Sequence, residues 1–102
     1  MMMLTKKNLE DLPGMYSQES IADPQAVVKF FTPDASWTWY AIEYEPEEKM
    51  FFGLVDGQCK ELGYFSLAEL ESARGPLGLK IERDYYFNPT PISKLWPERS
   101  AI

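Results

Sequence analysis

The chain has 102 residues, of which 45% are hydrophobic, 15% aromatic and 25% charged, and its formal net charge is −6. This length suits one compact domain over residues 1–102, and the apolar content is too high for a disordered chain. No apolar run is long enough for a membrane span, no histidine is present and Cys59 is the single cysteine, which excludes histidine-dependent catalysis and an intramolecular disulfide.

Residues 1–25 predict a short N-terminal helix and a connector. The leucines of Leu4–Leu12 favour a helix, Thr5 is placed as its N-cap, and Pro13 and the glycine after it end the pattern. From Gly14 to Gln25 the composition turns to Ser, Gln, Asp and Pro, which is typical of a loop. The start of the chain also lacks the basic end followed by an apolar stretch of a secretory signal, so a cytoplasmic location is expected.

Residues 26–87 predict a sheet with one inserted helix. A first strand is expected over Ala26–Phe31, where a proline turn follows. Three further strands, Ser36–Tyr44, Lys49–Val55 and Cys59–Phe65, are separated by short turns, including the favoured hairpin pair Asp56-Gly57. We therefore expect a three-stranded antiparallel meander at the centre of the sheet.

The strand Ser36–Tyr44 carries aromatic residues on both faces. Alternation with a period of two places Trp37, Trp39, Ala41 and Glu43 on one face, and Thr38, Tyr40, Ile42 and Tyr44 on the other. Two interpretations stay open for the aromatic side chains of the sheet. They form a core covered on both faces, or one face is exposed and binds a protein or unstacked bases.

The remainder of the chain predicts a helix, a last strand and a tail. Ser66 and Glu69 have the spacing of a capping box, and the helix they begin is expected to end near Arg74-Gly75-Pro76. Leu79–Phe87 alternates as a half-exposed strand. The Pro-containing tail, residues 88–102, is expected to dock through Leu95 and Trp96 and then to fray. Together these elements predict an α+β fold: an antiparallel sheet of four to five strands with a central meander, packed against one or two short helices.

Negative charge is concentrated in the central third of the chain. Between Glu43 and Glu71 there are eight acidic and two basic residues, whereas the rest of the chain is balanced. This distribution argues against broad nucleic-acid binding, which needs clustered Lys and Arg, and it favours a partner with a basic surface. The alternative is that residues 45–48 form a solvated turn that keeps the protein soluble.

Few catalytic mechanisms fit this inventory of residues. Without histidine and with one cysteine, no histidine-dependent metal site and no zinc site of cysteines can be assembled, and no glycine-rich phosphate loop is present. Cys59 is either a reactive thiol, which would lack a histidine to activate it, or a buried or incidental cysteine, and the second interpretation is favoured. We therefore expect no enzyme activity, no metal and no cofactor. Carboxylate chemistry is the alternative, in which acidic side chains would hold a magnesium ion as in a nuclease; the candidates are Asp34, Glu43, Asp56, Glu61, Glu82 and Asp84.

Four blocks of the sequence, Thr32–Tyr40, Phe51–Gly57, Glu61–Leu67 and Gly75–Asp84, resemble in order and spacing the bacterial domain-of-unknown-function family numbered two-nine-five-eight. The resemblance covers most of the chain. It implies a small protein of plasmids, phages and other mobile elements, sometimes encoded beside antirestriction genes, and it brings no established active site. An association of this kind does not give a mechanism.

Two functional hypotheses follow. The first is a non-catalytic interaction protein, with an antirestriction or other anti-defence role, whose partner is a protein with a basic surface. The second is a single-stranded nucleic-acid binder or metal-dependent nuclease, with phosphate contacts from Lys6, Lys7, Lys29, Lys80, Arg83, Lys94 and Arg99. The candidate interaction surface consists of Trp37, Trp39, Glu43, Glu45, Glu47, Glu48, Tyr85 and Tyr86.

Overall fold

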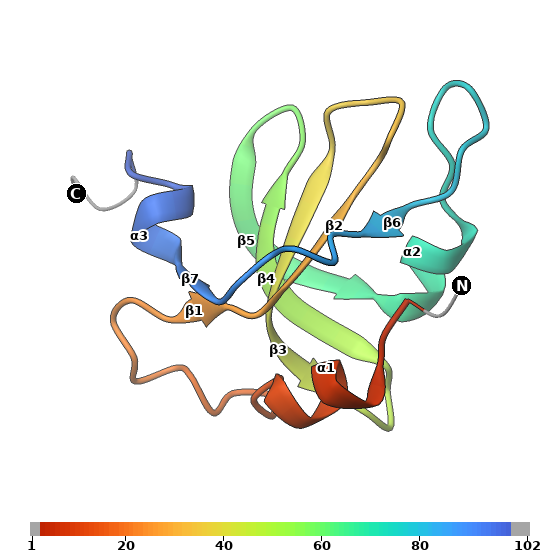
Figure 1. Cartoon of the computed structure of the whole chain (residues 1–102). Helices are drawn as coiled ribbons and strands as arrows, with labels where there is room; N and C mark the ends of the chain where they lie inside the picture. Colours follow the sequence, from red (N-terminus) through yellow and green to blue (C-terminus); the bar gives the residue numbers. More distant parts are fainter. Residues whose placement is uncertain (1–2, 99–102) are drawn as a thin grey trace.

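The computed structural model of the chain describes residues 3–98. One antiparallel sheet contains five strands in the order β5-β4-β3-β2-β6, and a separate pair joins β1 to β7 (Figure 1). The strands are β1 Gln25–Ala26, β2 Val28–Phe31, β3 Thr38–Glu45, β4 Met50–Asp56, β5 Lys60–Ser66, β6 Glu82–Arg83 and β7 Thr90–Pro91, and the helices are α1 Lys6–Asp11, α2 Leu67–Ser72 and α3 Ile92–Leu95. The predicted α+β fold with a central meander is confirmed.

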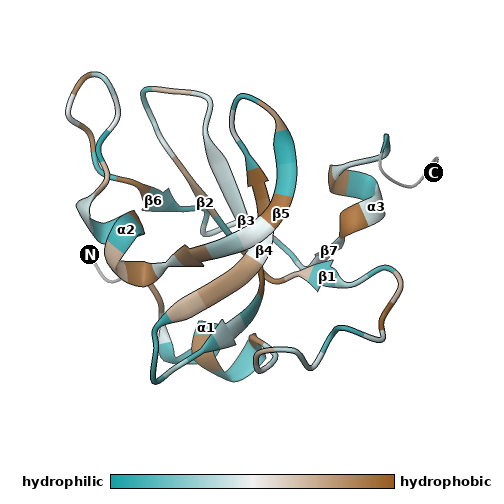
Figure 2. Ribbon diagram, turned by 180° about the vertical axis from the view of Figure 1, so that it is seen from behind, coloured by the Kyte–Doolittle hydropathy of each residue, from teal (hydrophilic) through white to brown (hydrophobic). Residues whose placement is uncertain are grey.

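The meander β3-β4-β5 is the centre of the sheet. β4 pairs with β3 from Met50 to Asp56 and with β5 over the same length. It is the most hydrophobic of the long strands, because it is covered on both faces (Figure 2).

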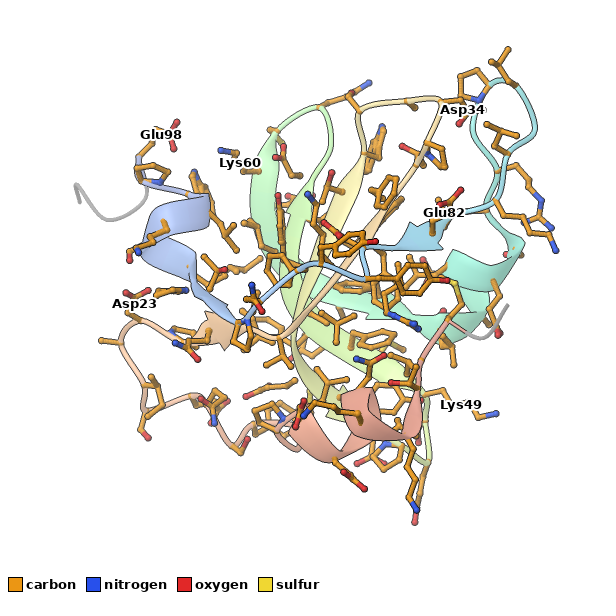
Figure 3. All side chains as sticks on the ribbon, viewed as in Figure 1. Asp23, Asp34, Lys49, Lys60, Glu82 and Glu98 are labelled. Atoms are coloured by element: carbon orange, nitrogen blue, oxygen red, sulfur yellow. The ribbon has the colours of Figure 1, made fainter. Side chains whose placement is uncertain are left out.

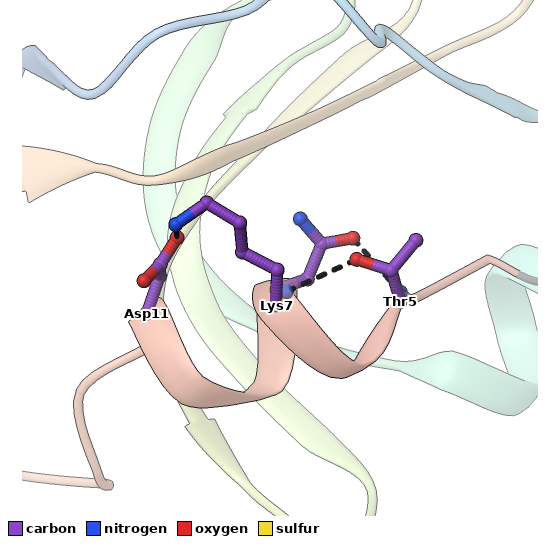
Figure 4. A network of polar contacts seen from close by, with 4 residues as sticks. Thr5, Lys7 and Asp11 are labelled. Carbon is purple, nitrogen blue, oxygen red and sulfur yellow. Dashed lines mark hydrogen bonds and ion pairs between the residues drawn. The ribbon is translucent and has the colours of Figure 1, made fainter.

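Both longer helices begin at the capping residues that the sequence predicts. At α1, the Asn8 amide donates to Thr5 Oγ1 at 3.1 Å and the Thr5 amide donates to Asn8 Oδ1 at 2.9 Å (Figure 4). The exposed pair of Lys7 Nζ and Asp11 Oδ2, 3.0 Å apart, adds little because solvent screens it. At α2, Ser66 and Glu69 form the same reciprocal box.

Two hydrophobic clusters cover the two faces of the sheet. The first cluster is covered by α2 and by the residues on either side of α1, Met3, Leu4 and Leu12, and it includes Phe30, Phe51 and Phe65. The second lies under α3 and the β1-β7 pair, and includes Ile42, Leu54 and Ile92. Most aromatic side chains of the central strands are therefore core residues, and the exposed aromatic side chains of the described residues include Trp37, Tyr64, Tyr85 and Tyr86.

A β-bulge in β3 corrects the predicted assignment of side chains to faces. Ala41 pairs with Gly53 and Glu43 pairs with Phe52, so Ile42 is an extra residue that has no partner on β4. The extra residue reverses the alternation. Glu43 consequently lies on the face of the second cluster, whereas Tyr44 packs in the first cluster with its ring 4.7 Å from that of Phe51.

Two predicted strands differ from the observed ones. Residues 26–31 are divided at Val27 into β1 and β2, which belong to different sheets. The strand predicted over Leu79–Phe87 is reduced to β6, because Asp84 begins a turn. Its side chain accepts a hydrogen bond from the Tyr86 amide at 2.9 Å, and its carbonyl accepts one from Phe87. The alternation of the sequence therefore predicted a longer strand than the structure has.

The C-terminal segment packs against the sheet through Leu95 and Trp96, as predicted, and forms the short helix α3 that was not predicted. The carboxylate of Asp23 accepts hydrogen bonds from the amide and hydroxyl of Ser93, and Lys60 Nζ donates to the Leu95 carbonyl at 3.2 Å (Figure 3). The predicted fraying concerns residues 99–102, which lie outside the described residues.

Candidate functional site

The turn between β3 and β4 borders an acidic hollow of the surface. This hollow, the acidic groove, has a volume of about 870 Å³. Its carboxylates come from the end of β3 and from the turn, and its other side chains come from the turn, from the connector before β1 and from β4 and β5. The lining residues are Met15, Tyr16, Glu45, Pro46, Glu47, Glu48, Met50 and Tyr64. Methionine and tyrosine provide an adaptable apolar floor, and the carboxylates provide negative charge beside it.

Glu43 holds the connector against the sheet beside this groove. Its side chain is only 3% exposed, and its two carboxylate oxygens accept hydrogen bonds from the Tyr16 amide at 3.0 Å and the Gln18 amide at 2.7 Å. A buried carboxylate is stable when backbone donors satisfy it in this way. Glu43 therefore has a structural role and is not part of the surface, which corrects its assignment as a contact residue.

The backbone at the groove is unusual in two places. Tyr16 has φ of 68° and Lys49 has φ of 52°, whereas most residues other than glycine avoid positive φ. Tyr16 lines the acidic groove, and Lys49 lies between two of its lining residues, Glu48 and Met50. Such conformations persist where surrounding contacts fix them, and the hydrogen bond from Tyr16 to Glu43 is one such contact.

Tyr16 and Tyr64 form a pair across the groove. Each side chain is more than half exposed, at 59% and 56% respectively. A hydrogen bond between the two side chains, followed by desolvation, raises the pKa of Tyr64 above its ordinary value of 10.0. The Tyr64 hydroxyl is therefore neutral near pH 7, and the acidic side chains of the groove are its carboxylates.

A second hollow, the connector pocket, adjoins the acidic groove and has a volume of about 340 Å³. It lies between the connector and the face of the second cluster. Its lining residues are Tyr16, Gln18, Glu19, Ile21, Ala22, Pro24, Ile42, Glu43, Phe52, Leu62, Tyr64 and Ile92. Tyr16 and Tyr64 line both hollows, so the two hollows are neighbours that meet at this pair.

The structure divides the predicted interaction surface into separate regions. Glu45, Glu47 and Glu48 lie together in the acidic groove. Trp37 lies eight residues away, before the other end of β3, which is roughly 26 Å along an extended strand. Its ring is 6.0 Å from that of Trp39, which packs against the first cluster. Figure 3 shows these two ends of the sheet, marked by Lys49 and Asp34.

Tyr85 and Tyr86 form a third region, on the loop that follows the edge strand β6. They are 60% and 90% exposed. β6 and β5 are the opposite edges of the sheet, and neither Tyr85 nor Tyr86 lines the acidic groove. The tyrosine pair of the loop and the carboxylates of the groove do not form one surface.

The carboxylates proposed for metal binding are dispersed. Within residues 3–98, no group of three or more acidic, cysteine or histidine side chains is placed to hold a metal ion. Asp34 Oδ2 accepts a hydrogen bond from the Leu77 amide at 2.7 Å and fixes the loop before β6, and Asp84 forms an ion pair with Lys29. Glu43 is occupied by the connector. These three carboxylates therefore have local structural partners.

The basic residues proposed for phosphate contact do not converge among the described residues. Lys6 and Lys7 lie on α1 and Lys94 lies on α3. Arg83 is buried, and its Nη1 donates to the Met3 carbonyl at 2.8 Å. Arg99 lies outside the described residues. Lys29 and Arg83 line one hollow, but Glu82 and Asp84 line it with them and offset their charge.

Outside residues 45–48, the acidic groove has four lining residues that the predicted interaction surface lacked: Met15, Tyr16, Met50 and Tyr64. Two of them follow from strand pairing, because Glu45 pairs with Met50 and Phe52 pairs with Tyr64 on the same face. Met15 and Tyr16 belong to the connector, and their position depends on the hydrogen bonds to Glu43, 25 to 27 residues away. No local sequence signal indicates such a contact.

The chain belongs to the family described as "protein of unknown function (DUF2958)", whose model matches residues 3–100. The predicted family is confirmed by this match. No curated protein and no solved structure matched the chain. The family description names no reaction, and in residues 3–98 no helix is long and apolar enough to cross a membrane.

Proposed function

We propose that this member of the DUF2958 family is a non-catalytic interaction protein that binds a protein partner with a basic surface through the acidic groove. The observation that carries the proposal is the placement of Glu45, Glu47 and Glu48 around an apolar floor of methionine and tyrosine. Charge at the rim steers a basic partner to the groove, and the floor provides area that is buried on contact.

The ionic state of the groove supports this proposal. Glu47 and Glu48 are exposed, and Lys49 is the nearest basic residue in the chain. No ion pair to the three carboxylates is found among the described residues. Carboxylates without a fixed cation are available to a partner, and their attraction falls as the salt concentration rises.

The partner class follows from the same charge. A cytoplasmic protein of a mobile element would meet basic surfaces on host nucleic-acid-processing enzymes, and occupying a DNA-binding groove would give the antirestriction or other anti-defence role. The alternative, a single-stranded nucleic-acid binder or metal-dependent nuclease, has less support because the basic residues are dispersed and the groove is acidic.

The test is affinity capture from nuclease-treated and untreated bacterial lysates, run in parallel, with the tagged full chain. We expect the triple variant Glu45→Gln, Glu47→Gln, Glu48→Gln to capture its basic protein partner about ten-fold less well, because each exposed charge contributes about 0.2–1 kcal/mol. Bound protein is identified and quantified by mass spectrometry at low and high salt.

A matched control distinguishes the effect of the groove carboxylates from the effect of the protein's net charge. The variant Glu10→Gln, Glu61→Gln, Glu71→Gln loses the same charge from exposed positions outside the acidic groove, and it is expected to bind like the wild type. Equal capture by the groove variant would refute the proposal. Capture that disappears after nuclease treatment would transfer support to the nucleic-acid alternative.

A further inference from the structure

The acidic groove and the connector pocket lie end to end on one face of the sheet. Met50 and Phe52 are two residues apart on β4 and point to the same face of the sheet as Leu62 on β5. The floor of the two hollows therefore follows β4 and β5. The connector forms the opposite wall, and the pair Tyr16–Tyr64 lies at the junction. A single extended segment can therefore contact both hollows.

The connector pocket has a different chemistry from the groove. Its accessible apolar side chains include Ile21, which is 47% exposed, and the half-buried Phe52 and Leu62. The carboxylate of Glu43 is buried and already bonded to two amides. A volume of about 340 Å³ lies at the lower end of the roughly 300–1,000 Å³ of small-molecule sites, and it suits one bulky side chain.

We propose that the partner of the acidic groove binds as an extended basic segment, with Lys or Arg side chains beside Glu45, Glu47 and Glu48 and one bulky apolar side chain in the connector pocket. This inference rests on the proposed function and specifies its partner. The charge of the groove selects the basic residues, and the connector pocket selects the apolar one.

The spacing of the partner residues follows from the strands. Phe52 in the pocket and Met50 in the groove are two residues apart on β4, about 7 Å. The pocket extends beyond Phe52 toward Leu62, so the apolar residue can lie further along the segment than this distance alone requires. In an extended segment, the apolar residue is therefore about two to four positions from the basic residues.

Preorganisation supports this binding mode. The connector wall of the two hollows is fixed by the Glu43 hydrogen bonds at one end and by the Asp23–Ser93 contacts at the other. A wall that is already ordered loses little conformational entropy when a segment binds.

The test uses two synthetic peptides that contain Lys-Arg-Lys, one with Phe three positions before the basic residues and one with Ala at that position. Binding to the full chain is measured by fluorescence anisotropy at low salt. We expect the Phe peptide to bind about ten-fold more tightly, the effect of burying one large apolar side chain. The variant Ala22→Trp, at an exposed position that lines the pocket, is expected to abolish this preference and to leave the salt dependence unchanged.

Ile21→Asp, also at an exposed position, is a second pocket variant with the same expected loss of preference. Equal, salt-dependent binding of both peptides would overturn this inference and leave the proposed function standing. Binding of neither peptide would overturn both. A preference for Phe that persists in both pocket variants would show that the apolar side chain binds elsewhere.

Discussion

Replacing Gly53 with alanine is expected to destabilise the protein by roughly 2–4 kcal/mol, the largest effect of any single methyl group in the sheet. Gly53 lies in the central strand β4 opposite Ala41, beside the bulge. A Cβ at this position would overlap the carbonyl oxygen of Tyr40, which is backbone and cannot rotate away. β3 would have to move, and the pairing on both sides of the bulge would be strained.

Gly63→Ala is the matched control, because Gly63 pairs directly with Gly53 on β5. A Cβ at Gly63 would meet no atom within 4 Å. Alanine there restricts the unfolded chain, so a stabilisation of about 0.4–1 kcal/mol is expected. Urea unfolding of the two variants measures both values. Equal effects of the two substitutions would show that the close approach at the bulge is not the cause.

Replacing Glu43 with alanine is expected to cost about 2–4 kcal/mol of unfolding free energy. The substitution removes two hydrogen bonds to a buried side chain and leaves the amides of Tyr16 and Gln18 without their acceptor. Because these amides belong to the connector, hydrogen exchange at both is expected to accelerate more than exchange within β4. Thermal unfolding and amide exchange measured by mass spectrometry test the two effects.

Glu61→Ala is the control for Glu43, since it removes an exposed carboxylate from the neighbouring sheet region. Its effect is expected to lie within about 0.5 kcal/mol of zero. Glu43→Gln keeps one acceptor oxygen and should lose less stability than Glu43→Ala. If Glu43→Ala unfolds like Glu61→Ala, the carboxylate does not hold the connector.

These two positions explain how the fold builds the acidic groove. The bulge turns Glu43 to the face of the second cluster, where it reaches the connector. Gly53 allows the close backbone approach beside the bulge. The connector then places Met15 and Tyr16 opposite the acidic turn. A surface of this shape therefore depends on one inserted residue, Ile42.

Much of the fold could be predicted because its signals are local. Thr5 and Ser66 cap their helices through residues three positions away, and the meander follows from short turns between apolar runs. The docking of Trp96 follows from its apolar size. Hydrogen-bonding and turn preferences of this kind act over a few residues, so a single sequence shows them.

The errors have non-local causes. A bulge depends on the register of two strands, and nothing around Ile42 indicates an extra residue, so Glu43 was assigned to the surface. The prediction of a strand over Leu79–Phe87 was wrong beyond Arg83, because the side chain of Asp84 accepts a hydrogen bond from the Tyr86 amide in a turn. The carboxylates of the groove were found from charge alone, whereas Tyr16 came into the site through a long-range contact.

The most direct test of the central claim is a titration of the ¹⁵N-labelled full chain with the Phe-containing basic peptide, followed by two-dimensional NMR. Binding in the acidic groove predicts amide shifts at Tyr16, Glu47, Glu48 and Tyr64, and none at Tyr86, on the far edge of the sheet. Shifts confined to the loop of Tyr86, or no shifts at low salt, would contradict the assignment of the acidic groove as the binding surface.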